Sequence, residues 1–295
     1  MVLPYVEMPR VAAGARIGWL SLGPFFWLLL AGAVVGAIAM WGHAKRLGVP
    51  PDDRRWFGLV ATLAALVGAH LFDVAWYQWD RAAADPALWY KLTNGLSVYG
   101  GLLGLAAVVV WMVRARGLDP RVYADLAALG AAVAVTVGRV ACALAHDHPG
   151  GPTDSILGVD YPSWLASVHR LGPGPVRALD LGVIELLLMV PVTAVALHLA
   201  FRARRRLRAG ALAAGLAILY ACMRFALDFL RLPSTEPTRA GLTAGQWGSL
   251  LMLALALAGL QRVLANGTIA PLATELAGAP GGRRPDLPRA TARRP

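Results

Sequence analysis

The sequence predicts an all-α fold, a polytopic membrane helical bundle of about seven transmembrane helices, with the N-terminus outside and the C-terminus cytoplasmic. Hydrophobic residues make up 57% of the 295 residues and charged residues only 15%, whereas an average soluble domain has roughly 25% charged residues. The apolar residues form seven long runs, and lysine and arginine are unequally divided between the connections. This pattern excludes a soluble globular domain.

Seven apolar runs are long enough to cross a bilayer. A spanning helix needs about 20 mostly apolar residues, and a helix satisfies its own backbone polar groups in lipid. The runs lie near residues 18–42, 57–77, 95–113, 122–145, 178–200, 210–230 and 246–264. The first run is too long for the apolar part of a cleavable signal peptide, so we expect it to span the membrane.

The basic residues predict the orientation of the bundle. Eighteen of the 28 lysines and arginines fall in the connections after the first, third and fifth runs, near the end of the seventh run (Arg262) and in the C-terminal tail. Cytoplasmic loops carry such an excess, and the tryptophans near the predicted helix ends fit an interfacial aromatic belt. The net charge of +11 is thus explained by membrane topology, and we expect no nucleic acid partner.

The chain is expected to divide into a transmembrane domain, residues 1–265, and a disordered basic cytoplasmic tail, residues 266–295. The tail is rich in Pro, Gly, Ala and Arg, which is typical of a segment without a packed core. The longest connection, near residues 146–177, is placed outside and contains three of the six histidines. Loops of this length are often functional.

Ionisable side chains inside the predicted spans mark a candidate site, because such groups are costly in lipid. Topology places side chains from five helices in the outer third of the bilayer, whereas Asp125, near an inner end, is expected to be a solvated or capping residue. The outer group comprises His70, Asp73, Arg139, Asp180, Glu185, Arg224 and Asp228, with Tyr99 at a similar depth.

The number of charges at one depth favours a polar cavity over ion pairs that only hold helices together. Arg224, Asp228 and Arg231 share one stripe of their helix at i, i+4 and i+7, so Arg224 and Asp228 can pair. Two arginines suit an anion, and guanidinium groups match the geometry of phosphate. A phospholipid head group is the anion available at this depth.

Four motifs lie beside these charges, and together they carry a resemblance. They are Ser97-Val-Tyr99-Gly100-Gly101, Gly138-Arg139 followed by Asp147 and Gly150-Gly-Pro-Thr-Asp154, Arg224-Phe-Ala-Leu-Asp228-Phe-Leu-Arg231-Leu-Pro233, and Gly241-Leu-Thr-Ala-Gly245-Gln246. With the order of the helices from about Phe57 to Leu264, these motifs resemble the prolipoprotein diacylglyceryl transferases of bacteria.

The resemblance implies an enzyme of the bacterial cytoplasmic (inner) membrane that takes part in lipoprotein biosynthesis and needs no cofactor or metal. Such an enzyme transfers the diacylglyceryl group of phosphatidylglycerol to the thiol of the lipobox cysteine in a preprolipoprotein signal peptide. Residues at the matching positions would bind phosphatidylglycerol: Arg139, Arg224, Arg231, Gly100 and Gly101. Supporting roles fall to His70, Asp73, Asp180, Glu185 and Asp228.

The sequence departs from the family pattern where a base is needed. The family histidine before Gly-Gly is Tyr99 here, and a tyrosine, which ordinarily ionises near pH ~10, is a poor base at neutral pH. The base is then His146, His148 or His70. The catalytic candidates are accordingly Arg139, Arg224, Tyr99, Asp147, His146 and His148.

Other interpretations stay open at this point. The same fold could serve a different acceptor or have lost the activity, and the His146-Asp147-His148 run could bind a metal, although two ligands one residue apart are weak evidence. A membrane transporter is a further alternative. Transporter sites usually lie near the midplane between repeated halves, whereas these charges lie off-centre and no internal repeat is visible.

Overall fold

Seven long helices dominate the computed structural model, which describes residues 15–17, 20–91, 95–116, 119–202, 207–232 and 238–266. They are α1 (Pro24–Arg46), α2 (Pro51–Tyr77), α4 (Val98–Arg116), α5 (Pro120–Ala145), α7 (Leu181–Phe201), α8 (Ala211–Asp228) and α9 (Ala244–Asn266). All seven are long and apolar enough to cross a membrane. The chain is therefore a multi-pass membrane protein, and the expected number of spans is confirmed. The predicted tail, apart from Asn266, lies outside the described residues.

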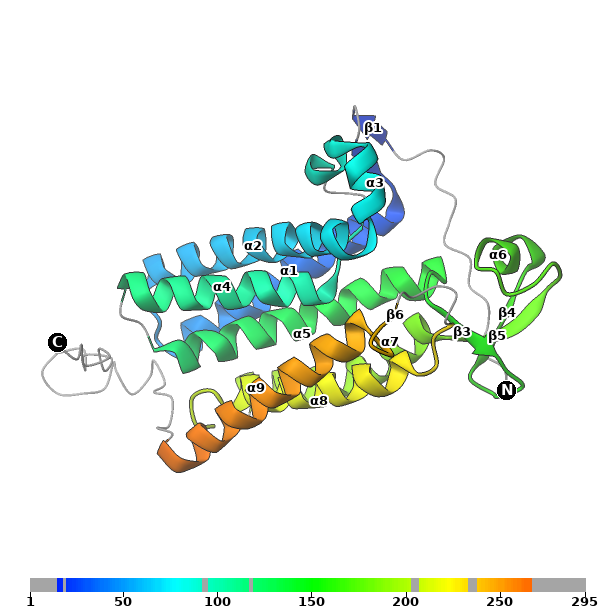
Figure 1. The fold of residues 1–295 in the computed structure, drawn as a ribbon. Coiled ribbons are helices and arrows are strands. Elements are labelled where there is room, and N and C mark those ends of the chain that lie inside the picture. Colours follow the sequence, from blue (N-terminus) through cyan, green and yellow to red (C-terminus); the bar gives the residue numbers. More distant parts are fainter. Residues whose placement is uncertain are drawn as a thin grey trace, which may run out of the picture.

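Helix α5 occupies the middle of the bundle. Figure 1 shows it between α1, α2 and α4 on one side and α8 and α9 on the other, and it contacts α1, α4, α7 and α8 directly. Of its apolar segment 61% is buried, compared with 44% for α8, the next most buried span. Side chains on α5 can therefore meet partners from several helices at once.

Small residues let α1 approach α5 closely. Gly32 and Gly36 lie one helical turn apart on the face of α1 that packs on α5. A Cβ atom on Gly32 would stand 2.8 Å from the carbonyl oxygen of Ala134, and one on Gly36 would stand 2.9 Å from the Cβ atom of Ala134. Transmembrane helices associate through such small-residue seams because lipid provides no hydrophobic drive between them.

A second small-residue seam joins α2 and α4. Gly100 and Gly104, again four residues apart, face Gly68 and Ala64 of α2. A Cβ atom on Gly104 would stand 2.7 Å from the carbonyl carbon of Ala64, closer than real side chains come. Two glycine pairs thus allow the close packing of α1 on α5 and of α4 on α2.

The first helix begins at Pro24 rather than near residue 18. The residues before it form a short antiparallel hairpin of β1 (Ala15–Ile17) and β2 (Leu20–Leu22). Proline favours the first turn of a helix because it lacks an N–H that the helix would leave unpaired, and Gly23 before it is extended. The apolar run alone does not reveal this boundary.

The long connection between α5 and α7 is a folded layer rather than a loop, and it is named the outer layer because it lies beyond the helix ends. It contains β3 (Pro149–Pro152), β4 (Gly158–Tyr161), α6 (Ser163–Val168) and β5 (Val176–Asp180), with the antiparallel strand order β3-β5-β4. Its small core is buried and includes Val159, Tyr161, Leu165 and Ala178. Because β5 extends to Asp180, α7 starts at Leu181, three residues later than expected.

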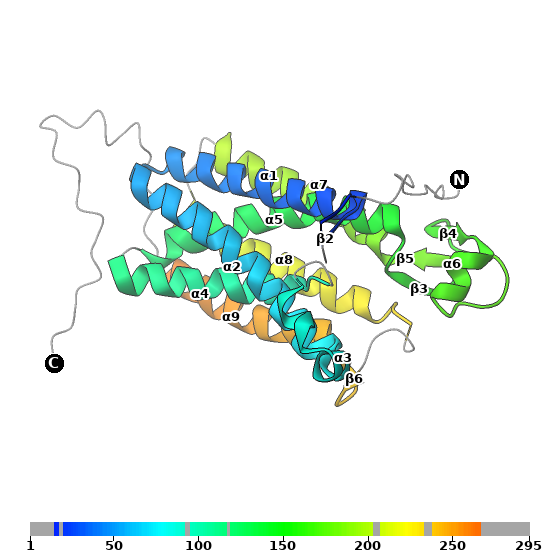
Figure 2. The same cartoon turned by 90° about the horizontal axis from the view of Figure 1, so that it is seen from above.

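This layer lies beyond the helix ends, on the side where α5 and α8 end and α7 begins (Figures 1 and 2). Three smaller elements lie next to helix ends on the same side of the bundle. After α2 come α3 (Trp79–Ala84) and η1 (Pro86–Tyr90), and before α9 comes the hairpin of β6 (Thr238–Arg239) with β7 (Leu242–Thr243). The guanidinium group of Arg239 lies 4.4 Å from the ring centroid of Trp76, so the hairpin packs on the end of α2.

Asp125 lies at the other end of the bundle and caps a helix there. Its carboxylate accepts hydrogen bonds of 2.7 Å from the backbone N–H groups of both Gly210 and Ala213, in the first turn of α8. The residue is buried, so the capping role is confirmed and the solvated alternative is wrong. An N-terminal helix turn leaves such N–H groups without partners inside the helix.

Replacing Gly104 with leucine should destabilise the bundle, because the new side chain would overlap the α2 backbone. Overpacking of this kind costs about 1–3 kcal/mol or more, measurable by reversible unfolding in detergent. Gly259→Leu is the matched control, since nothing lies within 4 Å of the corresponding Cβ position on α9. Equal stability of the two variants would contradict the proposed α2–α4 seam.

Candidate active site

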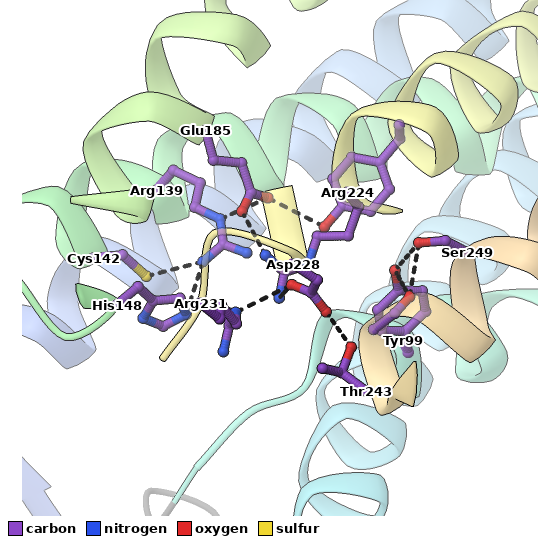
Figure 3. Close-up of polar contacts among 12 residues, drawn as sticks. Tyr99, Arg139, Cys142, His148, Glu185, Arg224, Asp228, Arg231, Thr243 and Ser249 are labelled. Carbon is purple, nitrogen blue, oxygen red and sulfur yellow. Dashed lines mark hydrogen bonds and ion pairs between the residues drawn. The ribbon is translucent and has the colours of Figure 1, made fainter. Parts of the chain in front are cut away.

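The carboxylate of Glu185 joins two buried arginines from different helices. Its Oε1 atom lies 2.9 Å from Nε of Arg139 on α5, and its Oε2 atom lies 3.3 Å from Nη1 of Arg224 on α8. Glu185, on α7, is fully buried, and both arginines are 6% exposed. Figure 3 shows the guanidinium groups of both arginines beside the Glu185 carboxylate. The two arginines that the sequence places at one depth are therefore linked through one carboxylate.

Asp228 extends this network to Arg231. Its Oδ1 atom lies 2.9 Å from Nη2 of Arg224 and 3.1 Å from Nε of Arg231. Its Oδ2 atom accepts a hydrogen bond of 2.5 Å from the Thr243 hydroxyl. The predicted pairing of Arg224 with Asp228 is thus present, and charges of alternating sign run from α5 to the end of α8.

Tyr99 lies at the far side of Asp228 from Arg139 (Figure 3), where it connects α4 to α9. Its hydroxyl group donates a 2.7 Å hydrogen bond to the carbonyl oxygen of Gly245 and lies 2.6 Å from Oγ of Ser249. A Cβ atom on Gly248 would stand 3.1 Å from Cγ of the tyrosine ring. The glycine in α9 therefore makes room for Tyr99.

The first turn of α9 is held in a reciprocal cap. The backbone N–H of Thr243 donates to Oε1 of Gln246, and the backbone N–H of Gln246 donates to the Thr243 hydroxyl oxygen, each over 3.0 Å. This arrangement satisfies two backbone groups that the helix leaves unpaired. It also directs the Thr243 hydroxyl towards Asp228, so the start of α9 is tied to the arginine network.

A second group of side chains surrounds the guanidinium group of Arg139. Its Nη1 atom lies 3.4 Å from Sγ of Cys142 and 3.2 Å from Nε2 of His148. Nδ1 of His148 lies 2.7 Å from Oδ1 of Asp147. Burial alone would raise the pKa of Asp147, but the neighbouring His148 side chain and the Arg139 guanidinium group outweigh burial and lower it.

The ligand-type atoms of Cys142, Asp147 and His148 all lie within 4.8 Å of one another. In this arrangement Nη1 of Arg139 contacts both the cysteine sulfur and the histidine nitrogen. A guanidinium group thus occupies the position between these two atoms that a cation would need, and its positive charge would repel one. The cluster therefore suits an anion bound to Arg139 better than a metal ion.

His146 turns away from this cluster although it is two residues from His148. It caps α5 in the left-handed conformation with φ 51°, and its Nδ1 atom lies 2.5 Å from Oδ2 of Asp180. Asp180 also accepts hydrogen bonds from the Tyr161 hydroxyl and from the backbone N–H of Val183. These three buried side chains fasten the outer layer to α5 and α7.

Two predicted supporting residues have partners elsewhere. His70 is fully buried, and its Nε2 atom lies 3.0 Å from the carbonyl oxygen of Leu88 in η1. Asp73 accepts a 2.6 Å hydrogen bond from the Gln78 side chain. No contact of either residue with Arg139 or Arg224 occurs in the described part of the chain. Both side chains hold the end of α2 and the elements that follow it.

The glycines predicted to bind lipid also pack against protein. Gly100 lies on the backbone of Gly68, and a Cβ atom on Gly101 would contact the carbonyl oxygen of Ala65 at 3.4 Å. Their positions are thus accounted for by the α2–α4 seam.

Gly150, by contrast, contacts the backbone of a residue in the arginine network. It forms a β-bridge with Arg231, and a Cβ atom on Gly150 would stand 2.8 Å from the carbonyl oxygen of Leu230. The motif glycine therefore allows the outer layer to approach the end of α8.

Three hydroxyl side chains of this site were not predicted from the sequence: Tyr220, Thr243 and Ser249. Tyr220 is buried and donates a 3.2 Å hydrogen bond to Oε1 of Glu185. Its place one helical turn before Arg224 is the only signal that could have identified it. Thr243 and Ser249 carry no charge, and their roles depend on contacts between α4, α8 and α9 that sequence spacing does not reveal.

The fold and this network define a polytopic membrane protein with a buried arginine–carboxylate site suited to an anion. The chain belongs to the prolipoprotein diacylglyceryl transferase family, whose model matches residues 15–262. It is 30% identical over 272 residues to the phosphatidylglycerol–prolipoprotein diacylglyceryl transferase of Chromohalobacter salexigens, which covers 88% of this chain and 92% of that relative.

Two further relatives have the same name. That of Nitrobacter winogradskyi is 30% identical over 254 residues, covering 84% of this chain and 82% of the relative. That of Streptococcus sanguinis is 28% identical over 243 residues, covering 81% of this chain and 90% of the relative. The expected family membership is thus confirmed over nearly the whole span of described helices.

Replacing Glu185 with leucine should strongly destabilise the protein, because it leaves Arg139 buried without its carboxylate partner. Breaking one side of a buried ion pair costs about 3–5 kcal/mol, and reversible unfolding in detergent would measure it. The double variant Arg139→Met/Glu185→Leu removes the Arg139 charge as well and should recover part of the loss. A single variant as stable as the wild type would contradict the bridging role of Glu185.

Proposed function

We propose that this protein transfers the diacylglyceryl group of phosphatidylglycerol to the thiol of a lipobox cysteine in the signal peptide of a preprolipoprotein. Membership of the transferase family and the names of the relatives support this reaction. We further propose that it acts in the bacterial cytoplasmic membrane. The orientation that the basic residues predict, with the N-terminus outside and the C-terminus cytoplasmic, would put the site beneath the outer head groups.

The bridge of Arg139, Glu185 and Arg224 is the observation that carries the proposal. In the linked network three guanidinium groups, of Arg139, Arg224 and Arg231, face the two carboxylates of Glu185 and Asp228. Each guanidinium group has five N–H donors, so a phosphodiester can accept hydrogen bonds from Arg139 and Arg224 alongside these carboxylates. Guanidinium groups donate paired hydrogen bonds to phosphate oxygens, and Arg139 and Arg224 are already oriented by their carboxylate.

The chemistry uses the positive charge of these arginines at the leaving group. A carbon–sulfur bond forms between the cysteine and the primary carbon of the diacylglyceryl group, while the bond from that carbon to the phosphate oxygen breaks. Glycerol phosphate leaves with the electron pair, so negative charge develops beside the arginines. Positively charged groups that are held in place before the reaction stabilise such developing charge.

The arginines and carboxylates contact one another directly, so the lipid phosphate must share guanidinium groups with Glu185 and Asp228. Such sharing keeps the arginines positioned after the product leaves. The acceptor cysteine would reach the site from the same end of the bundle, because a signal peptide in the membrane presents its lipobox cysteine near the outer surface. The outer layer, whose Gly150 forms a β-bridge with Arg231, lies at this end of the bundle.

Arg139→Ala and Arg224→Ala should each reduce thioether formation by about 100-fold or more, since removing one preorganised donor to a developing charge costs this much. The assay incubates the full chain with phosphatidylglycerol vesicles and a lipobox peptide, and reads the mass of the peptide. Arg121→Ala is the matched control, because Arg121 pairs with Asp119 at the opposite end of the bundle.

Arg139→Lys separates chemistry from folding. The lysine keeps a positive charge next to Glu185 but loses the planar pair of donors, so we expect a folded protein with at least a 10-fold lower rate. Wild-type rates in both alanine variants would refute the proposed phosphate site. Solute flux into vesicles without any lipid-modified peptide would favour a transporter instead.

A further inference from the structure

His148 is the one candidate base whose ring is both oriented by a carboxylate and adjacent to the arginine site. Nδ1 faces Asp147 at 2.7 Å, and Nε2 faces Nη1 of Arg139 at 3.2 Å. A guanidinium group only donates hydrogen bonds. Nε2 must therefore present its lone pair to Arg139, which leaves the ring hydrogen on Nδ1, the nitrogen that lies 2.7 Å from Oδ1 of Asp147. This tautomer is the one that a general base needs.

We propose that His148, positioned by Asp147, is the general base that removes the proton from the acceptor thiol. The assignment rests on the proposed transferase function and deepens it. Asp147 acts through His148 as a positioning residue. The family motif would put a histidine at position 99, where this chain has Tyr99, so the dyad supplies a base from a different segment of the chain.

Accessibility separates His148 from the other two histidines. The side chains of His148 and Asp147 are 24% and 34% exposed, so a peptide can reach them from the outer side. His146 is 2% exposed and is held by Asp180, and His70 is fully buried beneath η1. Neither of the latter can approach a substrate thiol without breaking these contacts.

The surroundings of His148 link proton removal to lipid binding. The charged or titratable groups facing it are Arg139 and Cys142 on α5, Glu185 on α7, His169 after α6 and Asp147 in its own segment. Without substrate, the Nε2 lone pair is engaged by Arg139. A phosphate oxygen that accepts a hydrogen bond from Nη1 would release this lone pair for the thiol.

The step balances within the proposed reaction. The thiol proton moves to Nε2 of His148, and the thiolate sulfur forms its bond to the primary carbon as the carbon–oxygen bond breaks. The phosphate oxygen keeps the electron pair of that bond. The imidazolium can then return its proton to the departing glycerol phosphate, which restores the neutral ring beside Asp147. No oxidant, reductant or metal is required.

The test compares a normal acceptor with one that needs no base. His148→Gln is assayed in phosphatidylglycerol vesicles with a lipobox peptide and with the same peptide carrying selenocysteine, whose selenol is ionised at neutral pH. We expect kcat with the cysteine peptide to fall by about 100-fold or more, whereas the KM for phosphatidylglycerol stays the same. With the selenocysteine peptide the variant should work within about 3-fold of the wild type.

Matched variants complete the test. His198→Gln, on an exposed position of α7 outside the site, should behave as the wild type with both peptides. Asp147→Asn should show the same selective loss as His148→Gln but to a smaller extent, and Asp147→Glu should restore the rate.

A wild-type rate of His148→Gln with the cysteine peptide would overturn the assignment. So would an equal loss with both peptides, because it would indicate a role in folding or lipid binding. No product from the wild-type protein would instead overturn the proposed function itself, and with it the base. These failures give different patterns and are therefore distinguishable.

Discussion

The buried carboxylate of Glu185 is the interaction on which the rest of the site depends. It uses both oxygens to hold one arginine from α5 and one from α8, and it receives a hydroxyl hydrogen bond from Tyr220. Charges inside a membrane are tolerated where they are paired within the bundle. The three helices are consequently locked at one level, and the arginines are arranged before any substrate arrives.

Two sets of contacts at the helix ends support this bridge. On one side the cap of α9 aims Thr243 at Asp228, which holds Arg224 and Arg231. On the other side the outer layer is fastened through His146 and Asp180, which leaves His148 to face Arg139. The site is therefore assembled from segments far apart in the chain, each held by its own local hydrogen bonds.

Much of the fold follows from the sequence, because length, hydropathy and charge placement determine the spans directly. The convergence of Arg139, Glu185 and Arg224 follows from their depth, and the Arg224–Asp228 pair follows from helical spacing. The difference between His146 and His148 does not, since it results from the left-handed turn at the end of α5. The β3-β5-β4 layer was also missed, because its pairs join residues from Tyr161 and Val176 to Pro149 and Asp180, 15 to 31 positions apart, across a Gly- and Pro-rich stretch. Gly100 resembles a family site residue, yet only the structure shows that it packs on α2.

Electron cryomicroscopy of the full chain in nanodiscs with short-chain phosphatidylglycerol would show whether Arg139 and Arg224 hold the lipid phosphate. We expect the lipid phosphorus between the guanidinium groups of Arg139 and Arg224, with Glu185 still contacting both. A head group bound elsewhere on the outer surface, with the Arg139–Glu185–Arg224 bridge closed and without phosphate contact, would contradict it.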